Sequence, residues 1–278
     1  MKYPALLRLI RFDKPIGTLL LWCPTAWALW LANQGSPSLQ LCINFILGTF
    51  FMRSAGCVIN DIADRRVDKF VERTQHRPLT TGEVTLRQAY TVLGLLLFLS
   101  FMILLRLPPL CFYYALFALA ITTLYPFCKR YIDAPQAVLG VAFSMGIPMA
   151  YAASHVSLDQ NVYVIAMINF AWVIAYDTLY AMVDREDDIK IGIKSTAILF
   201  GRWTQLIVAT LQLTMQVLWL MLAVSNGLPF FFYIAWGLGS LVFIYQHKLI
   251  QQKTKQAYFR AFLLNGLYGF ILWIGLLF

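Results

Sequence analysis

The sequence contains few charged residues for its length. Only 13% of its 278 residues are charged, whereas 60% are hydrophobic, and a soluble globular domain typically has about 25% charged residues. This composition argues against a water-soluble fold. The apolar segments also use most of the chain, so no second, soluble catalytic domain of ordinary size is expected. Any chemistry that the protein performs therefore takes place at or within a membrane.

Cysteine and histidine are scarce, and neither residue type forms a recognisable site. The chain has five cysteines and three histidines, without a CxxC pair or a histidine in metal-ligand spacing. All five cysteines fall in or beside apolar segments, so we interpret them as small core residues. Charged residues also interrupt the first apolar stretch, residues 1–17, so we expect no cleaved signal peptide.

Long apolar segments dominate what remains. Nine of them are long enough to cross a bilayer as helices, because a spanning helix needs about 20 apolar residues. The sequence therefore predicts an all-α integral membrane protein, with residues 1–278 forming one transmembrane domain. The predicted spans are 16–33, 41–60, 88–105, 109–127, 135–154, 162–182, 205–225, 228–246 and 261–278.

The basic residues are distributed unevenly between the two sides of these spans. With the N-terminus inside, the inner segments carry 19 of the 22 Lys and Arg residues, and only Arg106 falls on the outer side. Cytoplasmic loops of membrane proteins are enriched in Lys and Arg in this way. The asymmetry accounts for the net charge of +9 without nucleic-acid binding, and it predicts a cytoplasmic N-terminus.

Acidic residues gather in two of the predicted inner loops. One cluster, NDIADRRVD, covers residues 60–68, and the other, DREDD, covers residues 184–188. A single cluster of this kind is typically a solvated loop, but two clusters with related spacing favour a shared site. If the helices continue past the bilayer edge, polar residues four positions apart lie on one helix face. These residues are Asn60, Asp64 and Asp68 in the first cluster and Asp184 and Asp188 in the second.

Two charged residues, Arg53 and Asp177, lie inside predicted spans. Each precedes the first member of an acidic cluster, Asn60 or Asp184, by seven residues and so shares its helix face. Ionisable residues within a span usually face the bundle interior and are candidates for function. A mutually satisfied structural ion pair is the alternative. The clusters lie four helices apart, which is consistent with an internal duplication of four-helix units.

The acidic clusters contain oxygen ligands and no His or Cys, which favours a hard cation such as Mg²⁺. Two carboxylate arms suit a diphosphate held between metal ions, which neutralise charge as the diphosphate leaves. An apolar cavity beside them would hold an isoprenoid chain and keep water from an allylic carbocation. Nearby basic residues such as Arg65 and Lys194 are candidates for binding phosphate oxygens, although ordinary cytoplasmic positive charge is the alternative.

These motifs resemble the UbiA superfamily of intramembrane prenyltransferases. The family signature NDxxDxxxD stands here as Asn60, Asp61, Asp64 and Asp68. Three further segments are similar to the branch of the family that uses 4-hydroxybenzoate, and the resemblance extends over essentially the whole chain. The segments are DKPIGTLLLWCPTAWALW (13–30), YPFCKR (125–130) and YDTLYAMVDREDDIKIGIKSTAILFG (176–201).

The resemblance implies nine helices around a central cavity, with the acidic motifs at the cytoplasmic ends of helices 2 and 6. It implies transfer of a polyprenyl group from its diphosphate to the carbon ortho to the hydroxyl of 4-hydroxybenzoate. Such a reaction belongs to ubiquinone biosynthesis and places the protein in a bacterial inner membrane. It also implies Mg²⁺, with one metal arm formed by Asn60, Asp64 and Asp68 and the other by Asp184 and Asp188.

Further site residues follow from the resemblance. Asp64 and Asp184 are expected to be catalytic through the metal, and Asp177 to hydrogen-bond the phenol. Lys129 and Arg130 end the fourth span as a cationic pair, and an Arg fork matches a carboxylate. We therefore expect Arg130 to hold the benzoate carboxylate or the diphosphate. Lys14 is a further pocket candidate.

Other functions stay open on the sequence alone. A cation-coupled transporter also fits nine spans, but transporters tend to bind substrates near the bilayer midplane on broken helices. Another branch of the superfamily would use haem, a quinone precursor or a chlorophyll precursor as acceptor. A CDP-alcohol phosphotransferase is disfavoured because its DGxxAR signature is absent. No obligatory protein partner is expected.

Two acidic residues of the motifs, Asp61 and Asp187, lie off the shared helix faces. They either bind metal or serve as caps or salt-bridge partners.

Overall fold

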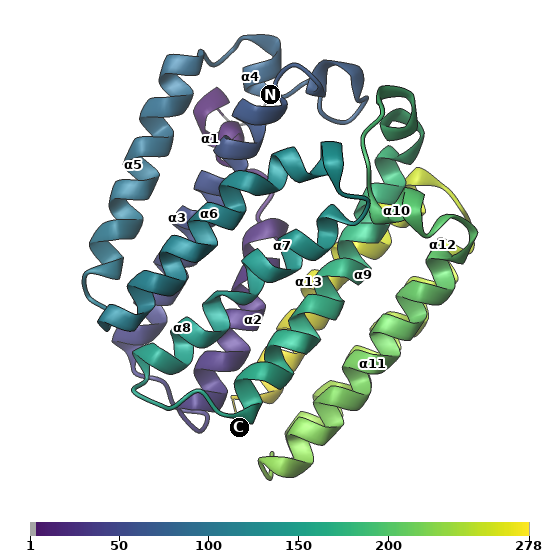
Figure 1. The fold of residues 1–278 in the computed structure, drawn as a ribbon. Coiled ribbons are helices and arrows are strands. Elements are labelled where there is room, and N and C mark those ends of the chain that lie inside the picture. Colours follow the sequence, from purple (N-terminus) through teal and green to yellow (C-terminus); the bar gives the residue numbers. More distant parts are fainter. Residues whose placement is uncertain (1–3, 278) are drawn as a thin grey trace.

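The computed structural model describes residues 4–277, and this part of the chain contains helices but no β-strand. Figure 1 shows long helices arranged side by side, with the short segments gathered mainly at one end of the bundle. The predicted all-helical class is confirmed. The elements are α1 (Ala5–Leu9), α2 (Ile16–Ala32), α3 (Leu39–Asp64), η1 (Asp68–Phe70), α4 (Pro78–Thr81), α5 (Leu86–Leu104), α6 (Pro109–Tyr131), α7 (Pro135–Ser144), α8 (Gly146–Ala153), α9 (Gln160–Ile191), α10 (Thr196–Leu199), η2 (Gly201–Trp203), α11 (Thr204–Ser225), α12 (Phe230–Ile250) and α13 (Lys255–Gly275).

The helices have the length and apolarity of an integral membrane protein. Within residues 4–277, eight helical segments are long and apolar enough to cross a bilayer. The first predicted span corresponds to α2, which is apolar but only 17 residues long. It packs against α8 and α13 inside the bundle. The integral membrane class is therefore supported, whereas the count of nine spans stays a prediction.

Polar residues define several helix ends. The Ser38 side chain accepts a hydrogen bond from the backbone N–H of Leu41 at the start of α3. Thr85 and Gln88 form a capping box at the start of α5. Such caps satisfy backbone N–H groups that have no partner within the helix. Gly192 ends α9 in the left-handed conformation, which glycine adopts without steric cost.

Two of the predicted helices are interrupted. The expectation of a continuous helix through Asp68 is wrong, because α3 ends at Asp64 and Asp68 begins the separate 3₁₀ helix η1. The predicted span 135–154 is divided at Met145 into α7 and α8. There, a Cβ atom on Gly146 would collide with the Thr25 side chain, so this glycine allows α8 to approach α2 closely.

A cluster of tryptophans fills the core between α2, α9 and α11. The rings of Trp27 and Trp172 lie 5.0 Å apart, and those of Trp27 and Trp219 lie 5.1 Å apart. Trp27 also donates a hydrogen bond from Nε1 to the Gly269 carbonyl of α13 at 3.1 Å. This packing fixes one side of the bundle. All five cysteines are free and buried or half-buried, as expected for core residues.

Candidate active site

A cavity of about 1400 Å³ lies within the bundle. Its wall includes acidic and basic residues near the C-terminal end of α3. Helix α5 packs along α3, and apolar side chains line the cavity away from that end of α3. The apolar lining includes Leu97, Phe101 and Leu104 of α5 and Phe112 and Leu116 of α6. The cavity therefore combines a charged end with an apolar channel.

The first acidic cluster supplies three oxygen-bearing side chains to the charged end. Asn60 and Asp64 come from the last turns of α3, and Asp68 comes from η1. The Asn60 Oδ1 atom is buried and accepts no hydrogen bond within the described residues. Asp64 lies 3.5 Å from the Lys129 amine. Burial raises the pKa of Asp68, although the Arg77 guanidinium, 2.8 Å away, favours its charged form.

The second acidic cluster reaches the same cavity from α9. This helix continues past the predicted end of its span, so Asp184 and Asp188 share one helix and both line the cavity. Arg73 donates hydrogen bonds to both oxygens of Asp184, at 3.0 Å from Nε and 2.5 Å from Nη2. Asp188 has no ion-pair partner among residues 4–277.

The donor set fits a hard divalent cation. In the described part of the chain, no three His, Cys, Asp or Glu side chains are already close enough together to form a metal site. The cavity nevertheless brings together the carboxylates of Asp64 and Asp184, and it contains the free Asn60 oxygen. Carboxylate and amide oxygens are typical ligands of Mg²⁺, which keeps other positions for water and phosphate.

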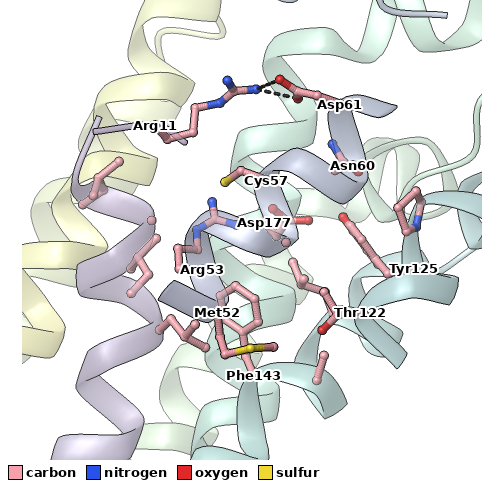
Figure 2. Close-up of a pocket in the computed structure, with 18 of the residues that line it drawn as sticks. Arg11, Met52, Arg53, Cys57, Asn60, Asp61, Thr122, Tyr125, Phe143 and Asp177 are labelled. Atoms are coloured by element: carbon pink, nitrogen blue, oxygen red, sulfur yellow. Dashed lines mark hydrogen bonds and ion pairs between the residues drawn. The ribbon is translucent and has the colours of Figure 1, made fainter. Parts of the chain in front are cut away.

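The two charges predicted inside spans, Arg53 and Asp177, both line this cavity. Figure 2 shows them close together, below Asn60 and near Tyr125. They are not within ion-pair distance, and Arg53 has no salt-bridge partner among the described residues. Its guanidinium lies 5.9 Å from the Phe143 ring and against Gly17, where a Cβ atom would collide with it. The alternative of a satisfied ion pair is therefore not supported.

The predicted substrate-binding lysines lie in the cavity wall. Lys14, Lys129 and Lys194 all line it. Burial lowers the pKa of Lys14. Lys194 already has partners from the protein. Its amine lies 2.8 Å from Asp133 and donates a hydrogen bond to the Tyr131 carbonyl at 3.2 Å.

The two predicted arginines are not among the lining residues. Arg130 donates to the Ala63 carbonyl at 3.3 Å and lies 3.9 Å from Asp64. Arg65 donates to the Ile62 carbonyl at 2.8 Å. Arg130 thus lies close to Asp64 of the first acidic arm but does not line the cavity. The substrate role of both arginines stays a prediction.

The remaining acids of the motifs have partners from the protein. Asp61 is 1% exposed and receives hydrogen bonds from Arg11 at 2.6 and 2.9 Å (Figure 2). Arg77 lies 3.0 Å from the same carboxylate. Asp187 accepts a hydrogen bond from the Glu72 backbone N–H at 3.2 Å. These contacts favour the structural interpretation of Asp61 and Asp187.

Comparison with known proteins identifies the family of the chain. The model of the UbiA prenyltransferase family matches residues 21–274. The chain belongs to the UbiA prenyltransferase family. The resemblance drawn from the motifs is therefore confirmed.

Members of this family with curated names are similar over nearly the whole chain. A 4-hydroxybenzoate octaprenyltransferase of Legionella pneumophila subsp. pneumophila is 55% identical over 269 residues, covering 97% of this chain and 95% of the relative. The 4-hydroxybenzoate octaprenyltransferase of Salmonella paratyphi B is 47% identical over 275 residues, covering 99% and 95%. These relatives support the branch of the family that the sequence motifs indicate.

Solved structures of UbiA homologues share the fold. The apo homologue from Aeropyrum pernix K1 gives a TM-score of 0.82 at 22% identity, covering 93% of this chain and 96% of that one. The homologue from Archaeoglobus fulgidus bound to GPP and Mg²⁺ gives a TM-score of 0.73 at 20% identity, covering 96% and 99%. At these identities, the likeness establishes the fold alone.

Proposed function

We propose that this protein transfers a polyprenyl group from an allylic polyprenyl diphosphate to 4-hydroxybenzoate in ubiquinone biosynthesis. The acceptor is the ring carbon ortho to the hydroxyl, and diphosphate is released. The observation that carries the proposal is one cavity that is lined by both acidic arms at its charged end and by apolar side chains along the rest of its wall. Relatives that are 47–55% identical carry the name of this activity.

Mg²⁺ is the proposed cofactor, in keeping with the bound metal named for the Archaeoglobus fulgidus homologue. One arm would hold it through Asn60, Asp64 and Asp68, and the other through Asp184 and Asp188. When bound, it supplies Lewis-acid neutralisation of the charge that develops on the leaving diphosphate. The chain itself contributes cations at the same end, because Lys14 and Lys129 line the cavity and favour bound phosphate oxygens.

Arg53 is the residue best placed to receive the carboxylate of the acceptor. Its guanidinium is in the cavity without an ion-pair partner in the described chain, and a buried unpaired charge favours an anionic ligand. Seven residues separate it from Asn60 on α3, which corresponds to about 10 Å along the helix axis.

The reaction breaks the allylic C–O bond and forms a C–C bond to the ring, which then loses its ortho proton. Asp177 lines the cavity beside Arg53 (Figure 2) and is proposed to hydrogen-bond the phenol of the acceptor. The apolar wall formed by α5 and α6 excludes water from the carbocation, which would otherwise be hydrolysed. Arg130 is proposed to support the diphosphate from the edge of the cavity.

The chain is proposed to form one domain with nine spans, including α2, in a bacterial inner membrane with the active site facing the cytoplasm. In Figure 1 the described chain begins and ends at opposite ends of the bundle, which is consistent with an odd number of crossings. A helix of 17 residues is within the range that spans a bilayer. An internal duplication of four-helix units remains part of this proposal.

The test is an assay of prenyl transfer by the purified protein in membranes. A panel of polyprenyl diphosphates and aromatic acids would be supplied with Mg²⁺ or with a chelator. We expect a prenylated 4-hydroxybenzoate product that requires both the metal and the diphosphate substrate. Product with a different acceptor only would assign another branch of the family, and substrate uptake without product would favour a transporter.

A further inference from the structure

A segment between α3 and α4, residues 65–77, connects the two acidic arms. We call it the strap. It leaves α3 directly after Asp64, and its Glu72 backbone N–H donates to Asp187 of α9 at 3.2 Å. The Glu72 carboxylate also lies 3.2 Å from Lys255 at the start of α13. The strap is therefore attached to three helices beside the charged end of the cavity.

Arg73 is a further attachment between the strap and α9. Its guanidinium donates to both oxygens of Asp184, at distances of 2.5 to 3.0 Å. Its carbon Cζ also lies 4.4 Å from the centre of the Tyr180 ring, a cation–π contact. A paired Arg fork of this kind is among the stronger hydrogen-bonding arrangements in proteins. Both oxygens that Asp184 would offer to a metal are thus engaged.

Asp64 of the first arm differs from Asp184 in this respect. Among residues 4–277, its carboxylate has only longer ion-pair contacts, 3.5 Å to Lys129 and 3.9 Å to Arg130. Asn60 keeps a buried Oδ1 atom that accepts no hydrogen bond from the described residues. Oxygen atoms for a metal are therefore available at Asn60 and Asp64 of the first arm, although Asp68 of that arm is paired with Arg77 at 2.8 Å. On the second arm, Asp188 has no ion-pair partner among the described residues, whereas Arg73 already neutralises Asp184.

We propose that Arg73 is a stand-in cation: before a metal binds, its guanidinium occupies the position at Asp184 that the metal would take. Asp184 then binds a metal only after its hydrogen bonds to Arg73 break. This inference rests on the proposed function. The release leaves the guanidinium without a carboxylate, so it is favoured when an anion enters with the metal. A metal–diphosphate complex supplies that anion, because its phosphate oxygens match the guanidinium fork. The metal and the diphosphate then bind the second arm cooperatively.

A purely structural ion pair would behave differently. In that case, removing Arg73 loosens the strap and weakens metal binding with or without diphosphate. If Arg73 competes with the metal, its removal instead strengthens the binding of metal alone and weakens the cooperation with diphosphate. The two interpretations therefore predict opposite signs for the same measurement.

The experiment measures Mn²⁺ binding to the purified full-length protein by electron paramagnetic resonance, with and without inorganic pyrophosphate. For Arg73→Ala, we expect Mn²⁺ alone to bind at least about fivefold more tightly than to wild type, the lower end of typical coupling between sites. We expect pyrophosphate to increase Mn²⁺ affinity much less than in wild type. Arg73→Gln, which keeps hydrogen-bonding groups but removes the charge, should change both quantities in the same directions.

Lys69→Ala is the matched control, because Lys69 lies on the strap, is exposed and does not line the cavity. It should bind Mn²⁺ as wild type does. Unchanged or weaker binding of Mn²⁺ alone by both Arg73 variants would overturn the stand-in role. If wild type fails to bind Mn²⁺ even with pyrophosphate, the metal site of the proposed function is wrong as well, so the two failures are distinguishable.

Discussion

At the scale of single side chains, the two acidic arms contribute equivalent carboxylates from unequal surroundings. Asp64 ends α3 with loose contacts, and Asp184 is held by a two-oxygen contact with Arg73. The motif spacing predicted the arms but not this inequality. Arg73 and Asp184 are 111 residues apart, and no local pattern connects residues that distant.

Asp64→Asn and Asp184→Asn should each reduce turnover about 100-fold or more, which corresponds to about 2.7 kcal/mol of transition-state stabilisation. An amide has no negative charge with which to hold the metal that stabilises the leaving diphosphate. The measurement is turnover at saturating Mg²⁺, with membrane insertion checked in parallel. Asp159→Asn, which changes the cap at the opposite end of α9, is the control. Either variant retaining more than a third of wild-type activity would contradict the two-arm site.

Arg53→Ala should raise the KM for 4-hydroxybenzoate by about tenfold or more, because a charge-assisted hydrogen bond contributes about 1.5–3 kcal/mol. The KM for the polyprenyl diphosphate should hardly change. Steady-state kinetics with each substrate varied in turn provides the measurement. Equal increases in both KM values would show that Arg53 supports the cavity in general and does not bind the acceptor.

Arg130→Ala should affect one substrate more than the other, and Arg130→Lys should restore only part of the loss, because Lys lacks the bidentate fork. Its position outside the cavity lining and 3.9 Å from Asp64 favours the diphosphate. The KM for the diphosphate is therefore expected to rise. A selective rise for the benzoate would reassign it, and small equal changes with normal kcat would leave it as ordinary cytoplasmic charge.

At the scale of helices, apolar length predicted the elements well because the bilayer fixes how long a spanning helix must be. Interruptions were harder to predict. The turn before Asp68 and the break at Met145 occur in sequences with helical patterns. At Gly146 the cause is the close approach of Thr25, which is a contact between distant segments. Helix existence is thus a local property, whereas helix continuity depends on packing.

Gly269→Ala should destabilise the protein by about 1–3 kcal/mol, the usual cost of overpacking. A Cβ atom at this position would lie 2.5 Å from the Trp172 ring and 2.7 Å from the Cys23 sulfur. Thermal unfolding in detergent provides the measurement. Gly94→Ala on α5 is the control, since no other segment of the described chain comes within 4 Å of its Cβ position. Equal melting temperatures for the two variants would show that α13 can move away from α2 and α9 at little cost.

At the scale of the whole molecule, the distribution of basic residues predicts the orientation in the membrane. A cysteine introduced at the exposed Ser157, in a background without the native cysteines, should react with a reagent that cannot cross the membrane. A cysteine at the exposed Thr81 should be protected in intact cells. Protection of the cysteine at Ser157 together with labelling of the cysteine at Thr81 would contradict the predicted orientation in the membrane.

The cavity with a charged end and an apolar wall also has a consequence for the fate of the two products. Diphosphate is an ion that returns to water, whereas a prenylated ring carries a chain that favours lipid by about 0.8 kcal/mol for each buried CH₂ group. The products of the proposed reaction therefore separate into different phases as they leave. Because they rarely meet again at the same site, this separation opposes the reverse reaction without any additional coupling to an energy source.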